Sequence, residues 1–427
     1  MAVSQTPPIP DVEAYVQAAA REAKAASVIL ARTSTRLKNQ ALVEAARRIR
    51  ERQAELQAQN QLDLDAGKEK GLSAAMLDRL ALTGKRLEAI AAMLEEVATL
   101  PDPVGEITGM TVRPNGMRVG RMRVPLGVIG LIYESRPNVT ADAAALCLKS
   151  GNACLLRGGS EAIHSNLALA RLLQGTLVDC GLPPAAVSFI ETTDREAVRV
   201  LCRLRGLVDV IIPRGGKSLI ETVVELATIP VLKHYDGNCH VYVDEHADPA
   251  MAHKICLNAK IQRPGVCNAA ETFLIHKAHS GAFLKNLLEE LHKHGVEVRG
   301  CEKTRALYPA VHPATEADWD TEYLDLIVAV KIVESFDEAL EHLGRHSSRH
   351  TDAIVTNDYA ASQRFLREVD SSSVMVNAST RFSDGGEYGL GAEMGISTDK
   401  LHARGPMGLV ELTCQKFIVL GDGHIRE

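Results

Sequence analysis

Short apolar runs alternate with longer amphipathic segments from residue 127 onward, and this alternation restricts the fold more than any other feature of the sequence. The first five runs are GVIGLIY (127–133), ACLLRG (153–158), VSFIE (187–191), VDVIIP (208–213) and CHVYVD (239–244). Apolar runs of this length predict buried strands, and the segments between them predict helices. Because strands that alternate with helices form parallel sheets, the sequence predicts an α/β fold.

A second series of apolar runs follows, again with helical segments between its members. These runs are TFLIHK (272–277), LDLIVAVKIV (324–333), TDAIVTN (351–357) and SVMVNAS (373–379). A chain of 427 residues is too long for one hydrophobic core, since domains cluster at about 100–200 residues. We therefore expect two α/β domains, with a boundary near 246–255, where His246 to Pro249 begins a new helix.

The residues before 127 predict helices and then a β-hairpin. Apolar stripes recur at helical spacing: Leu42, Ala45, Ile49 and Leu56, then Leu87, Ile90, Ala91, Leu94, Val97 and Ala98. The helix of the second stripe can start at Thr83 and must end near Pro101. Asn115-Gly116 predicts a type I′ turn and hence a hairpin over 110–125. The hairpin carries Arg113, Arg118, Arg121 and Arg123, and the residues alone favour a solvated face over an arm that reaches a second subunit.

Charge and composition restrict the class of partner. The formal net charge is -6 and no block of Lys and Arg occurs, so nothing indicates binding to nucleic acid or to an anionic membrane. No apolar window is long enough for a membrane span, and the first residues lack a signal-peptide pattern, so we expect a cytoplasmic protein that acts on small molecules. The nine cysteines are odd in number and never form Cys-x-x-Cys, which argues against disulfides and a zinc ribbon.

Two glycine-rich turns follow predicted strands, at the position where open parallel sheets bind phosphates. One is Arg157-Gly-Gly-Ser160 and the other is Arg214-Gly-Gly-Lys-Ser218. A P-loop would need glycine at the position of Ile211, so that hypothesis fails for the second turn. Either turn by itself is a weak signal, because paired glycines more often only form turns.

Cys267 stands out among the cysteines because it lies at a junction between a predicted helix and a strand. The segment QRPGVCN (262–268) places a Pro-Gly turn before it, with Arg263 and Asn268 as polar neighbours. These neighbours favour the thiolate, which is the nucleophilic form. A free cysteine is more often a small buried apolar residue, so both interpretations remain open at this point.

Three histidines, at positions 342, 346 and 350, recur at helical spacing and could contribute ligands to a metal. The sequence contains no HExxH or comparable ligand set. A structural or substrate-orienting role is therefore favoured, and we expect no metal.

Three segments together resemble the gamma-glutamyl phosphate reductases, which belong to the aldehyde dehydrogenase superfamily. They are QRPGVCNAAET (262–272), VESFDEALEHLGRHSSRHTDAI (333–354) and STDKLHARGPMGL (397–409). The resemblance implies an aldehyde dehydrogenase-like α/β fold, in which a doubly wound cofactor domain joins a catalytic domain and a small β oligomerisation arm. We expect the cofactor domain over 1–109 and 126–250, the catalytic domain over 251–380, and the arm over 110–125 and 404–427.

The same resemblance implies an activity. It is the NADPH-dependent reduction of L-glutamyl 5-phosphate to L-glutamate 5-semialdehyde, with release of phosphate, in proline biosynthesis. Cys267 is similar to the nucleophile that forms a thioester, and Asn138 to the donor that binds the oxyanion together with the backbone amide of Cys267. From the residues alone Asn138 is better read as a helix cap. The alternatives are an NAD(P)-dependent semialdehyde dehydrogenase for another acyl substrate and a non-catalytic scaffold.

The resemblance also implies the cofactor site. Arg157, Gly158 and Ser160 fall where the superfamily binds the adenosine ribose, and NAD-preferring members commonly have an acid at the position of Ser160. Serine does not repel a 2′-phosphate and Arg157 can pair with it, so NADP is expected. Gly215, Gly216 and Lys217 are expected along the pyrophosphate, and Glu322 at the nicotinamide ribose.

The substrate carries two anionic ends, which call for arginines. Arg136 and Arg263 are candidates for the phosphate, and Arg381 for the carboxylate, since ligands gather in loops at the ends of α/β strands. Oxidising aldehyde dehydrogenases have a glutamate base where this chain reads VLKHYDGN (231–238), with Lys233 and His234 nearest to its place. The absence of that glutamate suits an enzyme that must protect a thioester from water. The expected partners are a second copy of the chain, which would make the arginines of the hairpin interfacial, and a glutamate kinase that supplies the substrate.

Overall fold

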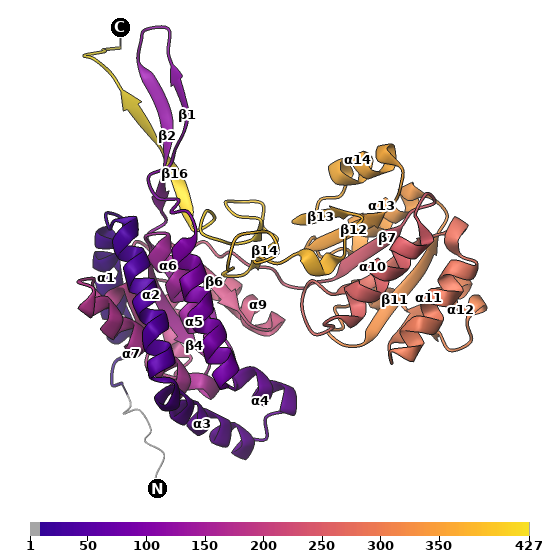
Figure 1. Cartoon of the computed structure of the whole chain (residues 1–427), viewed down its shortest axis with the longest axis horizontal. Helices are drawn as coiled ribbons and strands as arrows, with labels where there is room; N and C mark the ends of the chain where they lie inside the picture. The colour runs from indigo at the N-terminus through magenta and orange to yellow at the C-terminus, as the bar shows by residue number, and fades with distance from the viewer. Residues whose placement is uncertain (1–8, 427) are drawn as a thin grey trace. The chain divides into compact units, whose positions relative to one another are not determined.

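The computed structural model describes residues 9–426 and divides into two compact units. The first unit comprises the chain up to Lys233 together with Gly389–Gly395 and the residues from Met407. The second unit comprises His234–Tyr388 and Ile396–Pro406. Figure 1 shows the chain coloured from its N-terminus to its C-terminus. The predicted boundary near residue 250 is wrong by one strand, because residues 239–243 pair with strands of the second unit.

The first unit begins with helices, as the apolar stripes predict. They are α1 (Val12–Leu30), α2 (Thr35–Glu51), α3 (Gln53–Glu69), α4 (Ala74–Leu80) and α5 (Gly84–Thr99). Thr83 caps α5 by accepting a hydrogen bond from the amide of Arg86, and the whole predicted stripe of α5 is buried. The stripe from Leu42 to Leu56 extends over two helices, because α2 ends before Arg52 and α3 starts after it.

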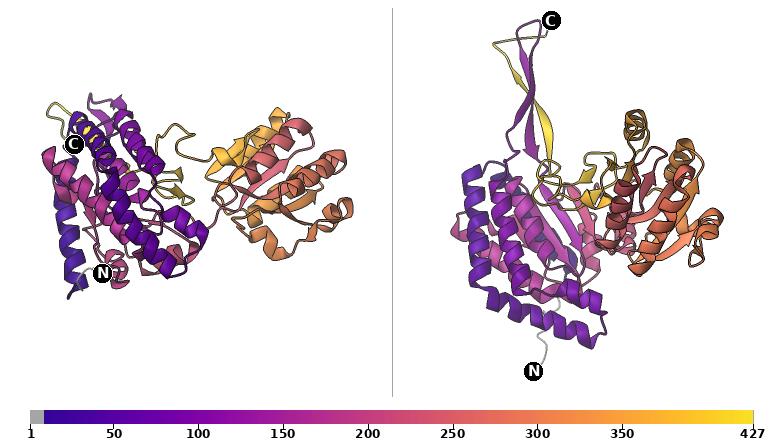
Figure 2. Two further views of the ribbon diagram at one scale, coloured as in Figure 1. Left: turned by 60° about the horizontal axis from the view of Figure 1, so that its bottom comes forward. Right: turned by 45° about the vertical axis from the view of Figure 1, so that its right-hand side comes forward.

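A parallel sheet of four strands forms the centre of the first unit. The strands are β3 (Val128–Tyr133), β4 (Ala153–Gly158), β5 (Val187–Phe189) and β6 (Val210–Arg214), in the spatial order β5-β4-β3-β6. The helices between them are α6 (Asn138–Lys149), α7 (Ile163–Asp179), α8 (Glu196–Leu201) and, after β6, α9 (Lys217–Leu226). Figure 2 shows helices of this unit packed against the sheet. The strand order reverses between β3 and β6, which is where sheets of this type bind ligands.

A three-stranded antiparallel ribbon, here called the arm, belongs to the same unit. It consists of β1 (Ile107–Val112), β2 (Arg118–Pro125) and β16 (Thr413–Leu420), with β2 in the middle. The hairpin is confirmed but the predicted type I′ turn is wrong: Gly116 has a φ of 90°, whereas Asn115 is not among the residues with positive φ. A single residue in the left-handed region is typical of a longer hairpin loop.

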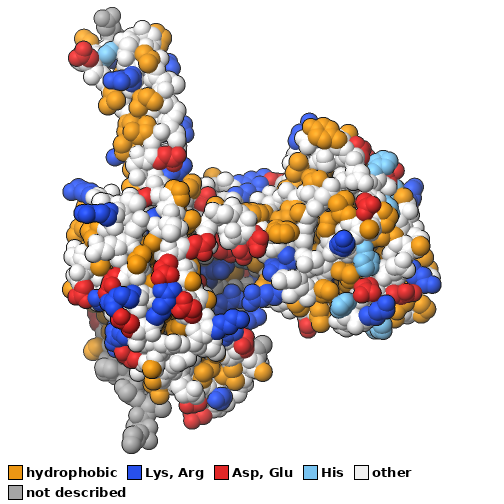
Figure 3. All heavy atoms as spheres, in the orientation of Figure 1, with side chains coloured by type: hydrophobic (Ala, Val, Ile, Leu, Met, Phe, Trp, Pro, Cys, Tyr) orange, Lys and Arg blue, Asp and Glu red, His pale blue; other side chains and the backbone are white. Residues whose placement is uncertain are grey.

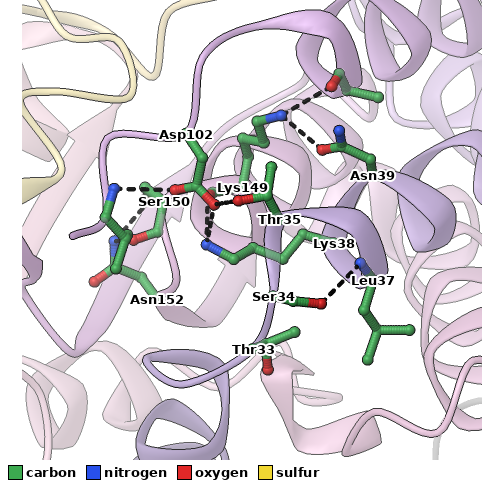
Figure 4. Close-up of polar contacts among 12 residues, drawn as sticks. Thr33, Ser34, Thr35, Leu37, Lys38, Asn39, Asp102, Lys149, Ser150 and Asn152 are labelled. Atoms are coloured by element: carbon green, nitrogen blue, oxygen red, sulfur yellow. Dashed lines mark hydrogen bonds and ion pairs between the residues drawn. The ribbon is translucent and has the colours of Figure 1, made fainter. Parts of the chain in front are cut away.

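Two buried lysines join the N-terminal helices to the start of the arm (Figure 4). Lys38 Nζ lies 2.7 Å from Asp102 Oδ2 and 3.1 Å from the carbonyl oxygen of Lys149. Lys149 Nζ donates to Asn39 Oδ1 at 2.6 Å and to the carbonyl of Ala98 at 2.8 Å. Burial lowers the pKa of Lys149. The network connects α2, the end of α5 and the end of α6, and so fixes the positions of these helices relative to one another.

A parallel sheet of seven strands forms the centre of the second unit, in the order β10-β9-β11-β8-β7-β12-β13. Its elements are β7 (Cys239–Val243), α10 (Pro249–Ile261), β8 (Ala270–His276), α11 (Ala282–Lys293), β9 (Glu297–Gly300), α12 (Glu302–Leu307), β10 (His312–Pro313), β11 (Ile327–Val333), α13 (Phe336–His346), β12 (Thr351–Val355), α14 (Tyr359–Glu368) and β13 (Ser373–Val376). A small ladder joins β14 (Ile396–Ser397) to β15 (Gly405–Pro406). The predicted strands form, and β9 and β10 are additions that their short, polar sequences did not reveal.

Among the described residues, no helix is both long enough and apolar enough to cross a membrane.

Candidate active site

Cys267 lies in the loop between α10 and β8, at the amino-terminal edge of the seven-stranded sheet. Its side chain is half-buried, whereas Cys239 and Cys256 of the same unit are buried. The thiol of Cys239 donates to the carbonyl oxygen of Cys267 at 3.1 Å. Burial raises the pKa of Cys239 well above its usual range, so this thiol keeps its proton and remains a donor. A hydrogen bond from a neutral, buried thiol therefore holds the backbone of the loop at Cys267.

Gly237 allows the loop of Cys267 to approach the segment that leads into β7. A Cβ atom at Gly237 would lie 2.1 Å from the carbonyl oxygen of Cys267 and 2.6 Å from its Cα. No side chain fits at such separations, so glycine is required for the close approach rather than for its φ angle. This contact positions the thiol relative to the segment that carries His234.

Two imidazoles lie beside the thiol. Single ligand atoms of His234, Cys267 and His350 all lie within 4.8 Å of one another. Nδ1 of His234 is 2.9 Å from the carbonyl oxygen of Ile396, which can only accept, so this nitrogen is the donor; in the neutral ring Nε2 then has the lone pair. Nδ1 of His350 is 2.9 Å from Thr351 Oγ1. The sequence indicated His234 only as a residue near the expected base, and its contact with Cys267 depends on the fold.

The three histidines of the signature segment separate into two environments. His342 and His346 lie on α13 with their ring centroids 4.5 Å apart, and the ring of Trp319 packs on His342. Burial lowers the pKa of His342 to about 2, so this ring is neutral. His346 Nδ1 is 2.8 Å from Asp320 Oδ1. Of these three histidines only His350, which follows the end of α13, lies beside Cys267, and the described group of close ligand atoms contains neither His342 nor His346.

Arginine side chains adjoin the loop of Cys267. Nε of Arg381 donates to Gln262 Oε1 at 2.8 Å, and a second nitrogen of its guanidinium donates to Asn268 Oδ1. Burial and the charge of Arg263 lower the pKa of Arg381, and Cys267 also lies within electrostatic range of it. The expectation that Arg381 lies where the strands end is wrong. After β13 the chain turns back, and Ser383 Oγ lies 3.1 Å from Ser373 Oγ at the start of that strand.

A buried ion pair lies under the same loop. Lys260 Nζ is 2.5 Å from Glu271 Oε2, and neither side chain is exposed. Burial raises the pKa of Glu271 to about 7 and lowers that of Lys260. The other carboxylate oxygen of Glu271 accepts the amide of Leu324 at 3.3 Å. This pair was not predicted from the sequence. The one signal for it was that Lys260 falls among the buried apolar residues of α10, where a charged side chain needs a partner.

Glu322 belongs to the loop that the ion pair holds. It is close enough to Glu271 for its charge to raise the pKa of that carboxyl. A Cβ at Gly265 would lie 3.6 Å from the carbonyl oxygen of Leu324, so this loop runs alongside the Pro264-Gly265 turn before Cys267. The second unit thus contains four of the predicted residues: Arg263, Cys267, Glu322 and Arg381.

The predicted oxyanion donor, Asn138, belongs to the first unit. It is the first residue of α6 and its side chain makes no cap; Nδ2 donates to Asp142 Oδ2 at 2.8 Å instead. The interpretation as a helix cap is therefore wrong. Burial raises the pKa of Asp142 to about 6. An amide nitrogen has two hydrogens, so Asp142 fixes the orientation of Asn138 and uses only one of them. Arg136 precedes the helix with an exposed side chain.

The residues predicted at the ribose lie at and just after the end of β4, with Arg157 and Gly158 in the strand and Ser160 beyond it. Arg157 donates to the carbonyl oxygens of Gly158 at 2.9 Å and Thr193 at 3.0 Å. Ser160 begins a short 3₁₀ turn and is exposed. The adjacent carboxylate, Glu161, accepts bonds from the amide and the hydroxyl of Ser135 at 2.5 and 2.7 Å, which were not predicted.

Another cation, Arg195, is exposed and close enough to lower the pKa of Arg157. It was missed because it lies after β5, far along the sequence from the turn of Arg157.

The second glycine turn joins β6 to α9, at the reversal of strand order. Gly215, Gly216 and Lys217 lead into the helix, and a Cβ at Gly216 would meet no atom. The carboxylate of Glu134 accepts the amide of Gly216 at 3.0 Å. A protein carboxylate thus lies where the helix terminus favours an anion. Sequence reasoning did not predict it, because Glu134 follows β3, a different strand.

Known proteins match this chain in sequence and in fold. The sequence model of the aldehyde dehydrogenase family matches residues 10–317. Gamma-glutamyl phosphate reductases from Moorella thermoacetica and Thermodesulfovibrio yellowstonii are 56% and 54% identical, each over 98% of this chain and 100% of the relative. The crystal structure of gamma-glutamyl phosphate reductase from Thermotoga maritima superimposes with a TM-score of 0.95 at 49% identity, covering 96% of this chain and 100% of that one. The chain therefore belongs to the aldehyde dehydrogenase family, in the group of gamma-glutamyl phosphate reductases.

Proposed function

We propose that the chain reduces L-glutamyl 5-phosphate to L-glutamate 5-semialdehyde and phosphate, with NADPH as the reductant, in proline biosynthesis. The observation that carries this proposal is the environment of Cys267: a half-buried thiol in a fixed loop, with an imidazole and guanidinium groups beside it. An acyl phosphate is activated toward attack by a thiolate, and it carries anions that guanidinium groups bind.

The imidazole of His234 is the proton acceptor in this proposal. The carbonyl of Ile396 holds its Nδ1 hydrogen, so Nε2 has the lone pair that can take the proton of Cys267. This is the arrangement of a nucleophile, a base and a group that orients the base. The resulting thiolate attacks the acyl carbon, the bond to the phosphate oxygen breaks, and a thioester on Cys267 remains. Phosphate is a good leaving group, so His234 retains the proton as an imidazolium.

That protonation state protects the thioester. An imidazolium cannot accept a proton from water, so His234 does not assist hydrolysis while the acyl group is bound. When the reduced adduct collapses to aldehyde and thiolate, the same imidazolium stabilises the thiolate that is released. The replacement of a carboxylate base by His234 thus suits reduction rather than oxidation.

The oxyanions of both steps need donors that are already oriented. We assign these to the backbone amide of Cys267 and to Asn138, whose amide group Asp142 orients. Arg263 and Arg136 are assigned to the phosphate and Arg381 to the carboxylate of the substrate. The placement of Arg263 and Arg381 near Cys267 supports two of these assignments.

Members of the aldehyde dehydrogenase family use nicotinamide cofactors, and the first unit has features that fit one. The backbone amides of Gly216 and Lys217 at the start of α9 suit a pyrophosphate. The guanidinium groups of Arg157 and Arg195 suit a 2′-phosphate beside Ser160. Glu322 is assigned to the nicotinamide ribose. Bound NADPH supplies the hydride that reduces the thioester.

We propose that the arm pairs subunits and that the protein is a cytoplasmic homo-oligomer. Figure 3 shows hydrophobic side chains along the arm, and the exposed ones include Ile107, Val112, Phe417 and Val419. Apolar side chains on a solvated ribbon are typical of a contact surface. Arg121 stacks on Phe417, 4.9 Å from its ring centroid. A glutamate kinase is the proposed supplier of the acyl phosphate.

The reverse reaction tests the function. Glutamate 5-semialdehyde should reduce NADP only when phosphate is present, and Cys267→Ala should abolish this activity, whereas Cys414→Ser, at an exposed cysteine of the arm, should leave it unchanged. Reduction that does not depend on phosphate would instead identify an ordinary semialdehyde dehydrogenase. Absence of turnover with an intact fold would support the scaffold alternative.

A further inference from the structure

The thiol and the two imidazoles form a cluster with the composition of a metal site. We propose that His234, Cys267 and His350 bind a thiophilic divalent cation of the zinc class, and that this cation blocks the nucleophile reversibly. Their ligand atoms lie within 4.8 Å of one another. Thiolate sulfur and imidazole nitrogen are ligands that Zn²⁺ prefers, and three protein ligands suffice when the fourth position holds water. The blocking effect rests on the proposed role of Cys267; the binding does not.

The separations indicate an open site that contracts on binding. Bonds of about 2.3 Å to sulfur and about 2.0–2.1 Å to nitrogen place tetrahedral ligands roughly 3.3–3.6 Å apart. The three ligand atoms therefore need to approach by roughly 1.5 Å at most. His234 and Cys267 are half-buried residues of loops, so side-chain rotation can supply this movement, while His350 is buried directly before β12.

Hydrogen bonds outside the cluster already orient both rings. His234 donates through Nδ1 to the carbonyl oxygen of Ile396, and Nδ1 of His350 lies 2.9 Å from Thr351 Oγ1. Histidine ligands of metals usually use one nitrogen for the ion and the other for a carbonyl, carboxylate or hydroxyl group. Each ring therefore has the second contact that a metal-bound histidine needs, and this observation is independent of the spacing of the three ligands.

Neighbouring charge limits the affinity. Arg263 and Arg381 are cations near the loop of Cys267 and oppose a divalent ion. The thiolate neutralises one of its charges, and an anion in the fourth position neutralises more. We therefore expect a reversible site rather than a permanent structural one. Binding replaces the S–H bond of Cys267 with a bond from sulfur to the metal, and the proton passes to the buffer; nothing is oxidised or reduced.

Cobalt(II) is the probe for the experiment, because a thiolate bound to it gives a charge-transfer absorption in the near ultraviolet. The full-length protein is titrated with Co²⁺ and then with Zn²⁺ as a competitor. Wild type should show the band at one equivalent, and Cys267→Ser should lose it. His234→Ala should weaken the affinity by at least about tenfold. Cys301→Ser and Cys414→Ser replace other cysteines that are not buried and should behave as wild type.

The outcomes separate this site from the function. A band that survives in Cys267→Ser, or an affinity that is unchanged in His234→Ala, overturns the proposal. His350→Ala should also weaken the affinity. Because it changes a buried ring, it is compared with His234→Ala, which changes a half-buried one, so that misfolding of one variant does not decide the test. The band is measured without substrate, so it tests metal binding independently of turnover. An enzyme that reduces its substrate but shows no band would overturn the metal site and leave the reductase activity standing. Alkylation of Cys267 by iodoacetamide should slow in saturating Zn²⁺ if the cation caps the thiol.

Discussion

Substitution of Gly237 by alanine tests whether the close approach of two loops sets the position of the nucleophile. The new Cβ would lie 2.1 Å from the carbonyl oxygen of Cys267, so the loops must separate by about 1 Å before the atoms reach van der Waals contact. A displacement of about 1 Å at a reacting group lowers the rate on the order of 100-fold, which equals about 2.7 kcal/mol of activation free energy. The strain should also lower the free energy of unfolding by about 1–3 kcal/mol.

The assay for Gly237→Ala is kcat in the phosphate-dependent reverse reaction, with the Kd for NADP and thermal unfolding measured in parallel. The Kd should not change, because the proposed cofactor residues other than Glu322 lie in the first unit. Gly344→Ala is the matched control: it lies in α13 of the same unit and its Cβ would meet no atom. Alanine there should stabilise the helix by about 0.5–1 kcal/mol without altering kcat. Wild-type kcat in Gly237→Ala would refute the positioning argument.

Three further predictions concern the first unit. Glu134→Gln removes the carboxylate that binds the amide of Gly216, so NADP should bind more tightly by about 0.3–1 kcal/mol, measured by calorimetry; weaker binding would show that Glu134 assists the cofactor. Ser160→Glu should shift the ratio of kcat/KM for NADP and NAD toward NAD by on the order of 1–3 kcal/mol, and an unchanged ratio would remove Ser160 from the ribose site. The pKa of Asp142 rises from 3.8 to about 6 on folding, so its contribution to the free energy of unfolding is complete below pH 3.8 and is lost as the pH rises through 6. Urea unfolding of Asp142→Asn should lack this pH dependence, and a profile identical to that of wild type would contradict the prediction.

Local signals account for what the sequence predicted. The helix that Thr83 caps and the strands of both sheets follow from periodicity and turn residues, which act over a few positions. The strands β9 and β10 escaped prediction because a four-residue and a two-residue strand carry too little pattern. The junction between helix and strand distinguished Cys267 among the nine cysteines, but only the resemblance between motifs indicated that it is a nucleophile.

The rest of the site depends on contacts between distant segments. The carboxylate of Glu134 reaches the start of α9, and Gly237 contacts the backbone of Cys267. Neither residue has distinguishing neighbours in the sequence, and their roles appear only when strands are placed side by side. The same holds for His234. The sequence predicted that it lies near the place of the expected base, but its closeness to the thiol follows from the strand order. Such contacts carry no periodic signature that a single sequence could reveal.

The third strand of the arm comes from the end of the chain, which has a consequence during synthesis. β2 is complete by Pro125, yet β16, which pairs with it along its length, starts at Thr413. At about 5–20 residues per second the ribosome needs roughly 15–60 s to make the residues between them. Throughout that interval one edge of β2 has open backbone donors and acceptors, and unpaired edges template aggregation. The arginines at 118, 121 and 123 lie on this strand, so charge repulsion between nascent chains opposes such pairing until β16 has been made.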